Sequence, residues 1–234
     1  MVTLKWGLQQ SNNWISAYLM SRLNPQQFVA LLQKYGIDSP DIHPSMSLCL
    51  GPCEVSVGEM VSAYTAFANN GIRCAPMFVT RIEDNMGNVL AEFQPRMIEV
   101  LSQEGCNKMI DMLRAVADGG TASRLRYMFD LQGDIGAKTG TTNRNSDAWF
   151  MGITPDLVSG CWVGGEDRDI HFNSMALGQG AAMALPIWGY YMKKVYRDKT
   201  LGYDPKAVFD IPRDYDSCYK DSIDSGVSIE DIFE

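Results

Sequence analysis

The sequence has few of the features that mark membrane-spanning, zinc-binding or disulfide-rich proteins. No apolar run approaches the roughly 20 residues that a membrane-spanning helix needs, and the richest stretch, Ala181 to Met192, is interrupted by Pro186 and Gly189. The chain holds only two histidines, and its six cysteines include no C-x2-C pair. We therefore predict no metal site and no cofactor, although the spacing of Cys49 and Cys53 leaves a metal site open as an alternative.

Basic charge is also scarce. The 234 residues carry 20 Lys and Arg against 28 Asp and Glu, a net charge of -8. This balance argues against a nucleic-acid binder, because such proteins need cations to displace counterions from phosphates. Nine of the acids and three of the bases lie in residues 204–234, which have few aliphatic side chains. We expect one domain over residues 1–203 and an acidic tail over residues 204–234 that is extended or disordered.

Four helices are predicted from capping residues and apolar spacing. Residues 24–36 open with Asn-Pro and close with Gly, and residues 56–71 open with a capping box and close with Asn-Asn-Gly. Apolar residues at helical spacing indicate two more helices over residues 102–117 and 185–196. We expect the last helix to pack on a sheet through Ile187, Trp188, Tyr191 and Val195.

Five strands are predicted from apolar runs bounded by polar turns. Residues 77–82 and 89–93 flank a Gly-containing turn and indicate a hairpin. Residues 135–141, 148–153 and 157–163 follow one another with short connections, which predicts three consecutive antiparallel strands.

The most informative string is Lys138-Thr139-Gly140-Thr141-Thr142, which lies on one of these strands. A glycine inside a strand is unfavourable unless another backbone or a ligand comes close. An ammonium group beside hydroxyls forms an edge that can bind a carboxylate. By itself, however, a K-T-G tripeptide also fits a surface lysine beside a turn.

A second string, Ser11-Asn12-Asn13, opens the first apolar stretch of the chain. It has the S-x-N form that accompanies K-T-G in penicillin-binding proteins and class A β-lactamases. Alone it is a weak signal, because the same residues are typical of a helix cap. The two motifs together are a stronger signal than either alone.

From Ser11 to about Met192 the chain resembles the C-terminal part of the transpeptidase domain of class A (bifunctional) penicillin-binding proteins. The matching segments are LQQSNNWISAYLM, GPCEVSVGEMVSAYTAFANNGI, GGTAS, GAKTGTTNRNSDAWFMGITPDLVSGCWVGGED and ALPIWGYYM. The resemblance implies an α+β chain with the β-lactamase/transpeptidase-like fold, in which helices flank an antiparallel sheet, and it implies that this fold is incomplete at the N-terminus.

The resemblance also implies a reaction and a set of site residues. The family transfers the acyl group of a D-Ala-D-Ala stem peptide to an amine of a neighbouring stem, and β-lactams occupy the same site. One side chain relays a proton to the leaving amine, a cation attracts the substrate carboxylate, and a strand N–H is one of the two donors of an oxyanion hole. The implied catalytic residues are Ser11, Asn13, Lys138 and Thr141, and the implied substrate-binding residues are Thr139, Gly140, Thr141 and Thr142.

The chain departs from the family at the nucleophile. The family places its active serine in an S-x-x-K motif some tens of residues before S-x-N, but only ten residues precede Ser11 here. The one match, Ser217 to Lys220, lies in the acidic tail and is interpreted as chance. We therefore expect that this chain alone is not acylated, and that one side of its sheet is unpaired.

The resemblance sets the expected location and partners. Peptidoglycan cross-linking takes place in the periplasm, at the outer face of the bacterial inner membrane, and the opening segment MVTLKWGLQQ is no signal peptide. An anchor and an export signal are therefore expected upstream. The expected partners are stem peptides, β-lactams and other proteins of cell-wall synthesis. Two alternatives stay open, a non-catalytic recognition or scaffold module and a β-lactamase-like hydrolase.

Overall fold

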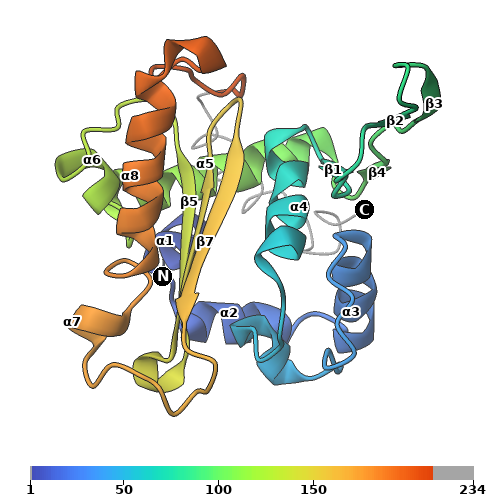
Figure 1. The fold of residues 1–234 in the computed structure, drawn as a ribbon. Helices are drawn as coiled ribbons and strands as arrows, with labels where there is room; N and C mark the ends of the chain where they lie inside the picture. Colours follow the sequence, from blue (N-terminus) through green and yellow to red (C-terminus); the bar gives the residue numbers. More distant parts are fainter. Residues whose placement is uncertain (1, 213–234) are drawn as a thin grey trace.

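A computed structural model describes residues 2–212 of the chain. Helices and strands alternate irregularly along this part, as Figure 1 shows. The α-helices are α1 (Leu4–Gln9), α2 (Asn13–Met20), α3 (Pro25–Lys34), α4 (Val57–Ala68), α5 (Gln103–Gly119), α6 (Arg124–Tyr127), α7 (Met175–Gly178) and α8 (Ala184–Arg197). The strands are β1 (Ile72–Cys74), β2 (Arg81–Glu83), β3 (Val89–Glu92), β4 (Met97–Glu99), β5 (Gly136–Thr141), β6 (Asp147–Ile153) and β7 (Val158–Gly164). Short 3-10 helices span Met46–Leu50, Asn143–Asn145 and Lys199–Leu201.

The predicted three-stranded antiparallel sheet is confirmed, with strand order β5-β6-β7. Its register pairs Lys138 with Met151 and Gly140 with Trp149. Helices α4 and α5 contact one face and α8 contacts the other, so the sheet lies between two helical layers (Figure 1). Met151 and Ile153 point toward the first layer, whereas Phe150 stacks on Trp188 of α8 with ring centroids 5.2 Å apart. The expected α+β fold with helices flanking an antiparallel sheet is therefore confirmed.

The helices begin where their caps predict. Asn24 accepts hydrogen bonds from two backbone N–H groups of α3, and Ser56 and Glu59 form the capping box of α4. Helix α5 ends two residues later than predicted, at Gly119, with Gly120 as its C-cap. Local capping chemistry was therefore a sufficient guide to where these elements begin.

The packing face of α8 was predicted only in part. Trp188 and Val195 are buried as expected, but Ile187 is 52% exposed and Tyr191 is 44% exposed. Leu185 and Met192 occupy the buried positions instead, because the stripe that repeats every three or four residues through Trp188 passes through them. The remaining buried residues of this face are Ala184 and Gly189.

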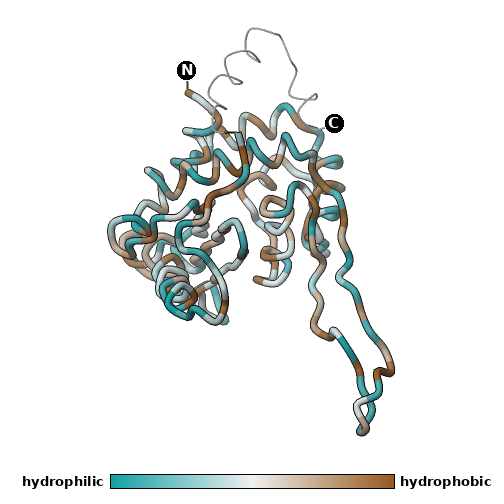
Figure 2. The backbone as a smooth tube through the Cα atoms, turned by 90° about the horizontal axis from the view of Figure 1, so that it is seen from above, coloured by the Kyte–Doolittle hydropathy of each residue, from teal (hydrophilic) through white to brown (hydrophobic). Residues whose placement is uncertain are grey.

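The other strands form two small antiparallel pairs. Strands β2 and β3 make the predicted hairpin, but β2 is limited to three residues and the register shifts after Ile82. The hairpin extends away from the body of the chain (Figure 2). Apolar side chains in the hairpin and in the segment before it are exposed, among them Phe78 at 93% exposure. Strands β1 and β4 pair at the base of the hairpin. This pair was not predicted. With three residues each, they are too short to show a period.

Residues 204–212 run along the body without helix or strand structure. The Asp134 N–H donates to the Ala207 carbonyl, and the Phe209 N–H donates to the Asp134 carboxylate at 3.0 Å. Phe209 and Ile211 also pack against the buried cluster that includes Ile110. The boundary after residue 203 stays a prediction, and residues 213–234, with the Ser217 to Lys220 motif, lie outside the described part.

Neither a candidate membrane span nor a candidate metal cluster occurs among the described residues. None of their helices combines the length and the apolar character that crossing a membrane requires. Within residues 2–212, no three His, Cys, Asp or Glu side chains gather closely enough to hold a metal ion.

Candidate active site

Ser11 lies in the tight connection between α1 and α2. Its φ of 51° places it in the left-handed region, and its N–H donates to the Leu8 carbonyl at 3.0 Å. The cap of α2 is Asn12, which accepts from the N–H groups of Trp14 and Ile15. The helix-cap interpretation of S-x-N therefore accounts for its middle residue and leaves the exposed Ser11 hydroxyl for other contacts.

Lys138 reaches from β5 to this connection. Its Nζ donates to the Ser11 Oγ at 2.9 Å and to the Thr139 carbonyl at 2.5 Å. The lysine is half-buried, and burial lowers the pKa of its ammonium group from 10.5 to about 8. Lys138 forms no ion pair with the described residues, so its charge is compensated only by a hydroxyl and a carbonyl.

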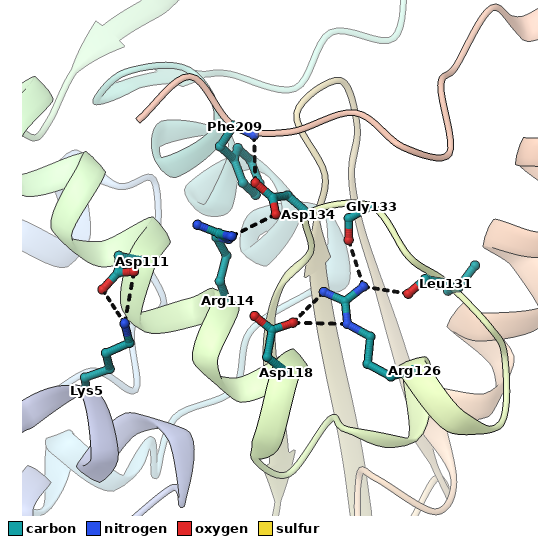
Figure 3. A network of polar contacts seen from close by, with 9 residues as sticks. All are labelled: Lys5, Asp111, Arg114, Asp118, Arg126, Leu131, Gly133, Asp134 and Phe209. Atoms are coloured by element: carbon teal, nitrogen blue, oxygen red, sulfur yellow. Dashed lines mark hydrogen bonds and ion pairs between the residues drawn. The ribbon is translucent and has the colours of Figure 1, made fainter. Parts of the chain in front are cut away.

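Helix α5 holds the Ser11 connection in place. Lys5 of α1 pairs with Asp111 of α5 at 2.9 Å, and the Gln9 side-chain amide donates to the Ala115 carbonyl at 3.2 Å (Figure 3 shows the ion pair). Because α5 also contacts β5, it links the two segments that carry Ser11 and Lys138.

The same helix takes part in two further ion pairs, through Arg114 and through Asp118. Arg114 meets Asp134 at 2.9 Å, and Arg126 meets Asp118 at 2.6 Å (Figure 3). Arg126 also donates to the carbonyls of residues 131 and 133, which fixes the loop before β5. These contacts hold both ends of the segment that leads into the K-T-G strand.

The three residues that follow Lys138 are fixed by close packing. Thr139 is only 8% exposed, and its hydroxyl lies 2.8 Å from that of Thr121. Gly180 rests on the strand so closely that a Cβ there would lie 2.5 Å from the Gly140 carbonyl, and its N–H donates to the Thr141 hydroxyl at 3.0 Å. A Cβ at Gly140 itself would lie 3.0 Å from the Trp149 Cβ, so the close neighbour at this position is a side chain of β6.

Asn13 and Thr142 are the last residues of the two predicted motifs. Asn13 begins α2 two residues after Ser11, and its side chain is exposed. The Thr142 hydroxyl accepts from the Asp147 N–H at 2.8 Å and lies 3.0 Å from the Ser146 hydroxyl. These hydrogen bonds of Thr142 lie within the β5–β6 turn, whereas Lys138 and Thr139 form hydrogen bonds to distant segments.

The arrangement can bind an anion and move a proton. A half-buried ammonium group with a pKa of about 8 can both attract a carboxylate and exchange a proton with a neighbouring hydroxyl. Residues that sequence reasoning did not assign to the site are Gly120, Thr121 and Gly180. The sequence pointed to Gly120 and Thr121 only through the GGTAS segment of the family resemblance, in which both lie.

Comparison with known proteins agrees with this geometry. A family model described as the penicillin binding protein transpeptidase domain matches residues 1–159. Penicillin-binding protein 1A of Aquifex aeolicus (strain VF5) is 38% identical over 211 residues, which make up 90% of this chain and 27% of that protein. Penicillin-binding protein 1A of Neisseria meningitidis serogroup A is 29% identical over 204 residues, 85% of this chain and 25% of that protein.

Solved structures show the same fold. The crystal structure of penicillin-binding protein 1A from Haemophilus influenzae has a TM-score of 0.78 at 25% identity, and the match covers 91% of this chain and 36% of that one. PonA1 from Mycobacterium tuberculosis, in complex with penicillin V, has a TM-score of 0.72 at 23% identity, and covers 90% of this chain and 58% of that one. The chain spans about a quarter of the length of the Aquifex and Neisseria relatives. It therefore belongs to the transpeptidase-domain family of class A penicillin-binding proteins.

Proposed function

We propose that this chain is the part of a serine D-Ala-D-Ala transpeptidase that carries the S-x-N and K-T-G motifs, and that it serves peptidoglycan cross-linking. The observation that carries the proposal is the 2.9 Å contact between Lys138 Nζ and Ser11 Oγ, which joins residues 127 positions apart. A hydroxyl on a tight connection and a cation on a strand have no local reason to meet. Their contact is the one that a shared catalytic groove requires.

Lys138 and Ser11 would act as a proton relay beside the acylated serine. With a pKa of about 8, a minority of Lys138 is neutral near pH 7, and the neutral amine can accept a proton that the ammonium form returns. Ser11, hydrogen-bonded to Nζ, would deliver that proton to the leaving amine. The ammonium form would also attract the terminal carboxylate of the stem peptide, or the carboxylate of a β-lactam.

The K-T-G strand would hold the substrate. Strand β5 is a terminal strand of its sheet, so a stem peptide can add to it as a further strand. The hydroxyls of Thr139 and Thr141 would donate to the carboxylate, and the Thr141 N–H would stabilise the oxyanion, a contact worth about 2.7–4 kcal/mol in other enzymes. We further assign Asn13 to the acyl part of the substrate and Gly140 and Thr142 to the walls of the groove.

The nucleophile would come from an S-x-x-K motif, and none occurs in residues 1–212. We therefore expect the 234-residue chain by itself to be inactive. In the complete enzyme the site would lie in the periplasm, at the outer face of the inner membrane, where the reaction meets stem peptides, β-lactams and other cell-wall synthesis proteins.

Labelling by a fluorescent penicillin tests the proposal. In a chain that also carries the S-x-x-K segment of the family, Lys138→Ala should reduce the labelling rate by at least about 100-fold, because the anion contact and the proton relay are both lost. Lys108→Ala is the matched control, since this lysine of α5 pairs with the exposed Glu104, outside both motifs, and its loss should leave labelling unchanged. The 234-residue chain alone should take no label.

Two results would contradict the proposal. If Lys138→Ala were labelled as fast as the wild type, Lys138 would not belong to the site, and a non-catalytic recognition or scaffold module would account better for the fold. If the labelled protein instead released its penicillin rapidly, it would be a β-lactamase-like hydrolase. A transpeptidase keeps the penicillin as a stable adduct.

A further inference from the structure

Thr121 touches both halves of the candidate site without belonging to either motif. It follows the C-cap of α5, and its N–H donates to the Gln9 carbonyl at 3.3 Å, two residues before Ser11. Its hydroxyl lies 2.8 Å from the Thr139 hydroxyl, next to Lys138. One residue is therefore hydrogen-bonded to the segment of the relay serine and to the strand of the cation.

The glycine before Thr121 makes this double contact possible. A Cβ at Gly120 would overlap the Gln9 carbonyl oxygen, so the turn can approach α1 only without a side chain there. The Gly120 and Ala122 N–H groups both donate to the Val116 carbonyl, which fixes the turn to the end of α5. The position of Thr121 is therefore set by backbone packing, independently of any ligand.

Each hydroxyl has its own proton, but only one of the two protons can lie between the two oxygens. If Thr139 donates to Thr121, its proton is not available to a ligand in the groove. If Thr121 donates to the Thr139 Oγ1, the Thr139 proton is free to point at a carboxylate. An anion in the groove favours the second arrangement, and a hydroxyl that already accepts a hydrogen bond is a better donor.

We propose that Thr121 is a positioning residue of the carboxylate site, which donates to Thr139 and thereby directs the Thr139 hydroxyl toward a substrate or β-lactam carboxylate. This inference rests on the proposed function, because it needs Thr139 to face that carboxylate. It adds a residue from outside the S-x-N and K-T-G motifs.

A purely structural role for Thr121 predicts something different. Loss of packing would weaken every ligand of the groove to the same degree. Loss of a directed hydroxyl would weaken only ligands that carry the carboxylate. Benzylpenicillin and its methyl ester differ in that one group, so the pair separates the two roles.

The experiment measures the non-covalent affinity of the 234-residue chain for each ligand, from the NMR shifts of the Gly140 and Thr141 amides. We expect Thr121→Val to weaken benzylpenicillin binding about 3- to 10-fold, the usual effect of one lost hydrogen bond, and to leave the ester unchanged. Thr121→Ser keeps the hydroxyl and should stay within about twofold of the wild type.

The inference is overturned if Thr121→Val binds benzylpenicillin like the wild type, or if it weakens both ligands equally. If the wild type itself does not distinguish the acid from the ester, the carboxylate site of the proposed function fails and this inference fails with it. If Thr121→Val does not give a native spectrum, Thr121→Ala is measured in the same way. Failure of both variants to fold would show that Thr121 is structural and would also overturn the inference.

Discussion

Arg114 and Lys138 are both half-buried cations that reach distant segments, but only Arg114 meets a carboxylate. Arg114 pairs with Asp134 at 2.9 Å, whereas Lys138 meets the Ser11 hydroxyl and the Thr139 carbonyl. Buried cations are usually paired, because removing a charge from water without a counter-charge is costly.

The difference separates cations that hold the fold together from the one that we propose to be functional. The cations of Figure 3 fix α5 to α1, to the loop before β5 and to residues 204–212. Lys138 anchors fewer segments, and burying its ammonium group costs more free energy. A fall in pKa from 10.5 to about 8 corresponds to on the order of 3 kcal/mol. A charge kept at such a cost is available to an anionic ligand.

The largest effect is expected when a paired cation is made unpaired. Asp134→Asn removes the counter-charge of Arg114 while keeping an acceptor for the Phe209 N–H. The free energy of unfolding should fall by about 2–3 kcal/mol, because a partly buried charge is left uncompensated. Urea unfolding measures the change. The exposed Asp41→Asn is the control, and an equal loss in both variants would show that the Arg114 pair has no special weight.

Removing the unpaired cation should have the opposite sign. Lys138→Met eliminates the cost of burying the ammonium group, so unfolding at pH 7 should cost about 1–2 kcal/mol more than in the wild type.

This gain should depend on pH in a defined window. The pKa of Lys138 is lower in the folded chain than in the unfolded chain, so the folded state binds fewer protons between pH 8 and 10.5. The stability of the wild type relative to Lys138→Met therefore rises with pH through this window, and the gain is largest below pH 8. Other groups titrate equally in both proteins and cancel in the difference. A pH-independent difference between the two would contradict the account.

The smallest effect is expected at a pair whose carboxylate is exposed. Lys108 and Glu104 lie one turn apart on α5 at 2.7 Å, and Glu104 is largely solvated. Lys108→Gln should lower the free energy of unfolding by no more than about 0.5 kcal/mol, because water already screens the Glu104 carboxylate. A loss comparable to that of Asp134→Asn, measured in the same urea titrations, would remove the distinction between pairs with an exposed carboxylate and pairs with a largely buried one.

The sequence predicted the parts of the molecule that depend on local chemistry. Caps located α3 and α4, and apolar runs with their turns located β5, β6 and β7. The K-T-G and S-x-N motifs nominated Lys138 and Ser11, but only packing in space could show that they meet.

The parts that sequence reasoning missed depend on long-range packing. Ile187 and Tyr191 of α8 have the right character for a buried face, yet the buried stripe through Trp188 passes through Leu185 and Met192 instead. Thr121 lies 18 residues before Thr139, and no period or motif connects them. The glycine that precedes Thr121, Gly120, is explained only by the structure, in which the backbone at the end of α1 lies against it.

The most direct test of the central claim is the pKa of Lys138, followed by the NMR shift of its labelled side-chain carbon next to Nζ. The account predicts a value of about 8 in the free chain, because burial disfavours the unpaired ammonium group, and a higher value once benzylpenicillin places its carboxylate beside Nζ. A value near 10.5 in the free chain, or one that benzylpenicillin leaves unchanged, would contradict the claim that Lys138 is an unpaired cation held for an anion.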